Sequence, residues 1–366
     1  MVEPRDYPAL NQANTRRVKV ILCGYGHLGS AVLNGLLKAS HCIEITGVLR
    51  WNSTDKGQLM NEPECRQFKQ IVDEHQLNDI VCSGVNGYQF SALLQKLQPH
   101  FVLVASWGEI FKPHLLEKET PLVINCHPSF LPKHRGPNPY ASVILQDESY
   151  SGVTFHKMTR RIDGGDIILQ DKFPLESNDT GFTVRKKCAA LAEPLTVTLA
   201  GQLKAHINQQ SNKQSELPAM KQPAAEKTYY PQLRENAGQI NWQESPDTIY
   251  RQMRGLFPWM ITYGIFPLSF SGLSVPLKLL FFKPRFHAMQ LVVKNQACSA
   301  GRILSISKKS IVVGLNDSKQ IFEVSNYRVS VGKKVLPIQA NTLFIRLFFP
   351  QGKHFICWPE ADSVLK

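Results

Sequence analysis

Residues 18–49 read VKVILCGYGHLGSAVLNGLLKASHCIEITGVL and set the fold class of the first half of the chain. The apolar, β-branched run at 18–23 predicts a buried strand, and the amphipathic stretch at 30–40 predicts a helix. The apolar run at 43–49 predicts a second strand. Strand, helix and strand in this order are typical of two parallel strands joined by a crossover helix.

The same alternation continues outward from this unit through the next 150 or so residues. Its later segments are helix signals at 66–75 and 89–98, strand signals at 102–106, 151–158 and 166–175, and a long helix signal at 181–205. Such alternation predicts a Rossmann-like, mostly parallel sheet with helices on both faces.

The pattern changes beyond residue 206. Residues 207–226 are rich in Gln, Ser and Pro, which is linker composition. Residues 246–256 predict a helix with Ser245 as N-cap, and short strand signals follow, the last at 320–329. They predict a small C-terminal β-barrel, OB-like in type. The expected domains are an extension (1–17), the α/β domain (18–206), a linker (207–239), a basic β-barrel (240–350) and a tail (351–366).

The positive charge of the chain is concentrated in its second half. The net charge is +13, of which residues 227–366 carry +11, from 18 Lys and Arg against 7 Asp and Glu. A bias this one-sided favours a polyanion partner, with RNA the leading candidate. The alternative is that the basic residues only keep the domain in solution.

The cysteines and the hydrophobic pattern indicate the cellular compartment of the protein. The eight cysteines form no C-x-x-C pair, which argues against a zinc ribbon or a disulfide framework. No apolar run reaches the roughly 18–20 residues of a membrane span, and residues 1–17 contain no apolar segment of a secretory signal. We therefore expect a cytoplasmic protein with reduced thiols and no membrane contact. The expected oligomeric state is a monomer.

Residues 24–29, GYGHLG, match the G-x-G-x-x-G pattern of dinucleotide-binding folds. That pattern also needs an acidic residue after the next strand, and here the strand is followed by Arg50 and Trp51. An arginine could meet the 2′-phosphate of NADP instead. The other interpretation is that the glycines let the first turn pack tightly, and a lone fingerprint is weak support for nucleotide binding.

An amide, an imidazole and a carboxylate are the candidates for chemistry. The apolar run at 121–124 leads into Asn125 and His127, which project from one face of a strand because side chains alternate. Asp163 follows in a glycine-rich turn between two predicted strands. All three fall at strand ends, and open α/β sheets bind ligands at the carboxyl ends of their strands.

These three side chains suit acyl transfer without a covalent enzyme intermediate. There is no G-x-S-x-G motif, Cys126 points away from the face of Asn125 and His127, and no cluster has metal-ligand spacing. Asn125 and an imidazolium at His127 could both donate hydrogen bonds to a developing oxyanion. Asp163 could keep His127 charged and oriented and help to remove a proton from an attacking amine.

The motifs around these residues resemble those of the folate-dependent formyltransferases. The resemblance lies in N-x-H-x-S-x-L-P-x-x-R-G at 125–136, G-V-T at 152–154 and D-x-G-D at 163–166. It implies transfer of a formyl group from the co-substrate 10-formyltetrahydrofolate to an amine, with no metal, and catalysis by Asn125, His127 and Asp163. It also implies a folate pocket formed by Ser106, Trp107, Gly108, Ile110, Ser129, Phe130, Leu131 and Pro132.

The second half is similar to the C-terminal domain of the methionyl-tRNA formyltransferases. The matching segments are QINW at 239–242, the helix at 246–256, FPW at 257–259, AGRIL at 300–304 and VGKK at 331–334. The resemblance implies the α-amine of methionyl initiator tRNA as acceptor, with the barrel contacting phosphates. The candidate tRNA contacts are Lys133, Arg135, Lys308, Lys309, Lys333 and Lys334.

Two departures from the family concern the acceptor side. The family has a basic loop after the second strand, whereas residues 50–67 carry few positive charges here. Small apolar residues usually follow R-G, whereas this chain has Pro137, Asn138 and Pro139. The alternative is therefore a sugar-amine N-formyltransferase with the same donor. An inactive RNA-binding protein on this fold and a formyltetrahydrofolate hydrolase are two further hypotheses.

Overall fold

The computed structural model describes most of the chain up to residue 335. The described residues are 17–51, 62–82, 84–117, 121–210, 216–270, 273–281, 289–293, 300–306, 310–315, 320–325, 327–331 and 334–335. The expected extension, apart from Arg17, and the expected tail lie outside them. By its backbone contacts the chain divides into two compact units; unit 1 is residues 1–127, 153–171 and 188–224, and unit 2 is residues 128–152, 172–187 and 225–366.

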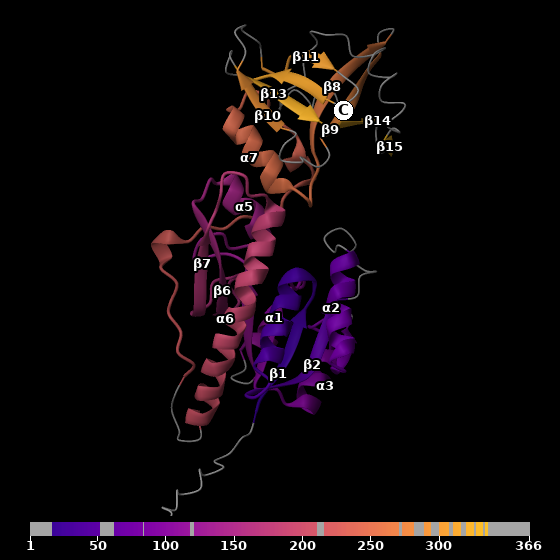
Figure 1. Cartoon of the computed structure of the whole chain (residues 1–366). Coiled ribbons are helices and arrows are strands. Elements are labelled where there is room, and N and C mark those ends of the chain that lie inside the picture. Colours follow the sequence, from indigo (N-terminus) through magenta and orange to yellow (C-terminus); the bar gives the residue numbers. More distant parts are fainter. Residues whose placement is uncertain are drawn as a thin grey trace, which may run out of the picture. The chain divides into compact units, whose positions relative to one another are not determined.

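A seven-stranded sheet runs in the order β3-β2-β1-β4-β5-β6-β7. Figure 1 labels four of its strands, β1, β2, β6 and β7. Neighbouring strands from β3 to β5 are parallel, and β5 pairs with β6 in the antiparallel direction. The expected Rossmann-like, mostly parallel sheet is confirmed. Its strands are β1 (Val18–Gly24), β2 (Ile43–Trp51), β3 (Asp79–Cys82), β4 (Phe101–Ala105), β5 (Leu122–His127), β6 (Tyr150–Lys157) and β7 (Ile167–Pro174).

Helices cover both faces of the parallel strands because those strands are apolar on both sides. β4 is buried along its whole length, as expected of a central parallel strand. Phe90 of α3 and Leu115 of α4 pack on one face, in a core cluster with Ile21, Val102 and Val104. The helices of residues 17–210 are α1 (Gly26–Lys38), α2 (Glu62–Glu74), α3 (Tyr88–Leu97), α4 (Pro113–Leu116), α5 (Pro139–Leu145) and α6 (Gly181–Gln210).

Close packing accounts for the glycines of the GYGHLG segment. A Cβ atom on Gly24 would lie 3.0 Å from the carbonyl oxygen of Ala105, and one on Gly29 would lie 3.2 Å from the backbone of Gly24. Gly26 has a φ of +64°, in the left-handed region that favours glycine. Each glycine therefore has a structural reason at the point where β1, α1 and β4 meet.

The second half contains α7 (Pro246–Leu256) and two four-stranded antiparallel sheets. The side chain of Ser245 accepts a hydrogen bond from the Thr248 N–H, so the expected N-cap is confirmed. The first sheet has the order β10-β13-β12-β11 and the second β15-β14-β9-β8. The strands are β8 (Thr262–Phe270), β9 (Leu273–Phe281), β10 (Met289–Val293), β11 (Ile303–Ile306), β12 (Ser310–Gly314), β13 (Gln320–Ser325), β14 (Tyr327–Val331) and β15 (Lys334–Val335).

One strand expected from the sequence is wrong. The stretch 320–329 forms two strands, β13 and β14, that belong to different sheets. β13 pairs with β12 and β10, whereas β14 pairs with β9 and β15. Local residue pattern cannot distinguish one long strand from two strands that change partners, because the partners are distant in sequence. Among the described residues, no helix is long and apolar enough to cross a membrane.

Candidate active site

Two polar side chains stand at the end of the buried strand β5. Val123 and Ile124 are buried, and Asn125 and His127 follow them on alternate positions. In the antiparallel register with β6, Asn125 lies opposite His156, and His127 lies opposite Thr154. The sheet therefore fixes where both side chains begin, and it places a second imidazole beside the amide.

Asp163 brings the three predicted catalytic residues together within unit 1. Its Oδ1 lies 3.4 Å from Asn125 Nδ2 and 3.6 Å from His127 Nδ1. The side chains of His127 and Asp163 are only 5% and 12% exposed. Little water can screen the interaction between these two groups, so the carboxylate is well placed to favour an imidazolium at His127.

His156 is a fourth member of this cluster that the motifs did not identify. Its Nδ1 lies 2.9 Å from the Lys157 carbonyl oxygen, which can only accept, so Nδ1 carries the hydrogen. In the neutral ring Nε2 is then an acceptor, and it lies 3.2 Å from Asn125 Nδ2. This contact orients the amide so that its nitrogen faces His156 and Asp163. The available sequence signal was position: His156 lies two residues after Thr154, on the same face of β6.

The turn that carries Asp163 is tightly constrained. Asp163 has a φ of +49°, which is uncommon for a residue other than glycine. A Cβ atom on Gly165 would lie 1.8 Å from the Lys157 carbonyl oxygen. The Lys157 N–H also donates to the carbonyl oxygen of Asp166 at 2.9 Å. The turn is thus pressed against the end of β6, and only glycine fits at residue 165.

The loop after β4 holds the first group of predicted folate residues. Ser106 has a φ of +61°, Trp107 packs against the core, and the side chain of Ile110 is 71% exposed. The carboxylate of Glu109 accepts hydrogen bonds from the Val85 N–H at 2.7 Å and the Asn86 side chain at 2.6 Å. These bonds fix the loop and leave an apolar side chain at its surface.

The second group of predicted folate residues lies in unit 2. Ser129 is buried and donates a hydrogen bond from Oγ to the Lys133 carbonyl oxygen at 2.8 Å, which closes the turn. Leu131 is fully buried and precedes a cis peptide bond to Pro132. The ring of Phe130 meets Tyr150 edge-on, with centroids 5.7 Å apart.

The predicted tRNA contacts differ in their surroundings. Lys133 is paired with Glu148, with Nζ and Oε2 3.1 Å apart. The hydrogen bond that Lys133 donates to Glu148 raises the pKa of Lys133 above its ordinary value. The backbone of Arg135 is paired with Thr228 and Tyr230. Lys308, Lys309 and Lys333 lie outside the described residues, and of Lys334 only the backbone, in β15, is described.

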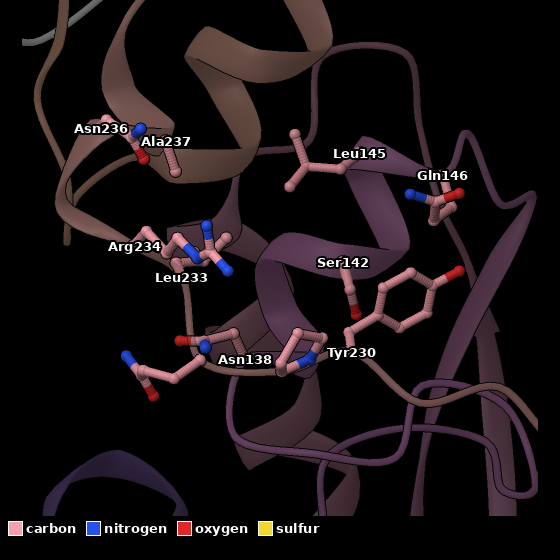
Figure 2. A pocket seen from close by; sticks show the side chains of 11 residues that line it. Asn138, Ser142, Leu145, Gln146, Tyr230, Leu233, Arg234, Asn236 and Ala237 are labelled. Atoms are coloured by element: carbon pink, nitrogen blue, oxygen red, sulfur yellow. The ribbon is translucent and has the colours of Figure 1, made fainter. Parts of the chain in front are cut away.

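A pocket in unit 2 lies between α5 and the segment 230–237 (Figure 2). Its volume is about 270 Å³, and Arg234 is the one charged residue that lines it. The Nδ2 of Asn138 is buried with no hydrogen-bond partner among the described residues. Asn138 is one of the three residues by which this chain departs from the expected motif, so the departure forms part of the pocket wall.

Cys126 has the properties of a core residue. Its side chain is buried, and this burial raises the pKa of the thiol well above its ordinary value. A thiol held in the neutral form is a poor nucleophile. Within the described part of the chain, no group of three or more His, Cys, Asp or Glu side chains is arranged to hold a metal ion.

Solved structures share this fold. HypX from Aquifex aeolicus, in complex with tetrahydrofolic acid, superposes with a TM-score of 0.56 at 13% identity, over 93% of this chain and 51% of that one. An N-formyltransferase from Helicobacter canadensis, in complex with folinic acid and dTDP-3-aminofucose, gives a TM-score of 0.52 at 18% identity, over 84% and 100%.

Sequence comparison identifies the family. Residues 16–199 match the model of the family described as formyl transferase. The methionyl-tRNA formyltransferase of Caldicellulosiruptor saccharolyticus is 28% identical over 76% of this chain and 81% of its own length. That of Streptococcus mutans is 27% identical over 81% and 87%. The resemblance read from the motifs is confirmed: the chain is an enzyme of the formyl transferase family.

Proposed function

We propose that the protein transfers the formyl group of 10-formyltetrahydrofolate to the α-amine of methionyl initiator tRNA. One observation supports this chemistry best: Asn125 Nδ2 and His127 Nδ1 both lie within 3.6 Å of Oδ1 of Asp163. An amide N–H and an imidazolium N–H on one side of a strand end are the donors that a formyl oxyanion requires.

Each residue of the trio has a separate task. As the amine attacks, Asn125 Nδ2 exchanges its 3.4 Å hydrogen bond to Asp163 for one to the oxygen on which negative charge develops, and His127 donates a second hydrogen bond to that oxygen. Asp163 faces His127 Nδ1, which leaves Nε2 as the nitrogen that we assign to the oxyanion. Asp163 also accepts a proton from the attacking amine, directly or through a water molecule. The bond between the formyl carbon and N10 of the donor then breaks, and the leaving nitrogen of tetrahydrofolate takes up that proton.

The proposed donor-binding residues are the ones that the resemblance indicated. They are Ser106, Trp107, Gly108 and Ile110 in unit 1 and the turn at 129–132 in unit 2. The rigid Glu109 contacts support the first loop, and the exposed side chain of Ile110 offers apolar surface for a flat ring system. The protein would supply binding and orientation, while the folate supplies the formyl group.

The second half of the chain supports methionyl initiator tRNA as the acceptor. The match to the Streptococcus mutans methionyl-tRNA formyltransferase covers 87% of that protein's length, so the similarity extends past the catalytic domain. We propose a catalytic domain at 18–206, a linker at 207–239 and an OB-like barrel at 240–350. The two antiparallel sheets of the second half support the barrel. A net charge of +11 on residues 227–366 suits contact with RNA phosphates. Free cysteines among the described residues fit a cytoplasmic site of action.

A sugar-amine acceptor is the second candidate. Residues 50–67 carry three positive and three negative charges, which gives no basic loop for an acceptor stem. The Helicobacter canadensis enzyme, which has this fold, was solved with an amino-sugar nucleotide.

One competition assay separates the two candidates. Purified protein and 10-formyltetrahydrofolate are offered methionyl initiator tRNA together with a panel of amino-sugar nucleotides. We expect formylation of the tRNA, with a rate that falls steeply as salt is added, because phosphate contacts release counterions. Transfer to a sugar alone, at a rate insensitive to salt, would refute the tRNA acceptor. Formate release without any amine would indicate a hydrolase.

A further inference from the structure

A glutamine from the linker holds the turn that carries Asp163. The side-chain Nε2 of Gln222 donates to the carbonyl oxygens of Asp163 at 2.8 Å and Gly165 at 2.7 Å. Two residues earlier, Met220 exchanges a pair of backbone hydrogen bonds with Ile167, at 2.7 and 2.8 Å. Residues 220–222 of the linker therefore contact both the turn that carries Asp163, which we call the catalytic turn, and the first residue of β7.

The turn needs such a restraint. The left-handed backbone of Asp163 is energetically unfavourable and persists only where surrounding contacts impose it. An amide nitrogen has two hydrogens, and both hydrogens of Gln222 Nε2 are used on this turn. The two bonds bracket Gly164, so they fix the direction in which the Asp163 side chain leaves the backbone.

We infer that Gln222 is a positioning residue for the formyl-transfer reaction. It acts through the backbone of residues 163–165, which sets the Asp163 carboxylate at 3.6 Å from His127 and 3.4 Å from Asn125. The inference rests on the proposed role of Asp163. The linker then has two roles: it connects two parts of the chain, and it positions a residue of the active site.

The test begins with two substitutions of similar shape. Gln222→Met removes both donors, and Gln222→Glu places acceptors opposite two carbonyl oxygens. A displacement of about 1 Å can cost about 100-fold in rate, so we expect kcat to fall by roughly 10- to 100-fold in Gln222→Met and further in Gln222→Glu. The KM values for donor and acceptor should stay near those of the wild type. Gln202→Met, at an exposed position of α6, is the matched control and should leave kcat unchanged.

A double-mutant cycle separates positioning from general stability. If Gln222 acts through Asp163, then Gln222→Met should cost little in an Asp163→Asn background. Losses that multiply in the double mutant, or a wild-type kcat in Gln222→Met, would overturn the inference. If Asp163→Asn itself leaves kcat intact, the role of Asp163 fails, and the role of Gln222 fails with it. If the wild type transfers no formyl group from 10-formyltetrahydrofolate to methionyl initiator tRNA, the proposed function fails instead. A large loss in Asp163→Asn with none in Gln222→Met would remove only the role of Gln222.

Discussion

Gly165→Ala is the substitution whose effect follows most directly from the backbone. The added Cβ would lie 1.8 Å from the Lys157 carbonyl oxygen and 2.9 Å from its carbonyl carbon. Both are main-chain atoms, and the Lys157 N–H is bonded to Asp166, so no flexible side chain can give way. To reach a contact of 3.0 Å, the turn must move by about 1.2 Å.

This displacement gives the expected magnitude. Overpacking of this kind costs about 1–3 kcal/mol of unfolding free energy. The turn also carries Asp163, two residues earlier, so the carboxylate moves away from His127. A shift of about 1 Å at a reacting group costs about 100-fold in rate. We therefore expect kcat to fall by about two orders of magnitude in a protein that still folds.

The measurement is kcat for formyl transfer beside the unfolding free energy from urea titration. Gly201→Ala is the control, because a Cβ atom there meets nothing within 4 Å. Residue 201 lies inside α6, so alanine should stabilise the protein by about 0.5–1 kcal/mol and leave kcat unchanged. A Gly165→Ala variant with wild-type kcat would show that the position of the turn does not control the reaction.

Four further outcomes are expected. His127→Ala should lower kcat by about 100- to 1,000-fold, and a loss below tenfold would contradict its role at the oxyanion. Cys126→Ala should keep kcat within a few-fold of the wild type, and the native thiol should resist alkylation, since burial raises its pKa. Ser245→Ala should cost about 1 kcal/mol of unfolding free energy through loss of the helix cap, measured by urea titration. Burial raises the pKa of Glu148, but the hydrogen bonds that Lys133 and His134 donate to it outweigh burial and lower the pKa below its ordinary value of 4.5. The Glu148 carboxylate should therefore stabilise the folded protein fully at pH values above 4.5. The difference in unfolding free energy between wild type and Glu148→Gln should shrink as the pH falls further, and a difference independent of pH would contradict the ion pair.

The sequence predicted the parallel sheet because its signals are local. The strands at 18–23 and 43–49 and the intervening helix are visible as runs of apolar residues with the periods of strand and helix. The structure places β1 at Val18–Gly24 and β2 at Ile43–Trp51, and it starts α1 earlier than expected, at Gly26. The helix can begin there because the glycines at 24, 26 and 29 allow β1, α1 and β4 to approach closely.

The strand partners of the second half were beyond the reach of local pattern. The stretch 320–329 has the composition of one strand, yet it contributes β13 to one sheet and β14 to the other. Hydrogen-bond partners in a sheet lie far apart in sequence, and pairing energy depends on those partners more than on intrinsic propensity.

The sequence by itself determined the family and the identity of the candidate catalytic groups, because Asn125, His127 and Asp163 stand in long ordered motifs. Only the tertiary structure decided how they are held. It showed that His156 orients the amide of Asn125 at 3.2 Å and that Gln222, 59 residues beyond Asp163, binds the backbone of the catalytic turn. Hydrogen bonds of this kind depend on distances of about 3 Å between groups that only folding brings together, so no local residue pattern records them.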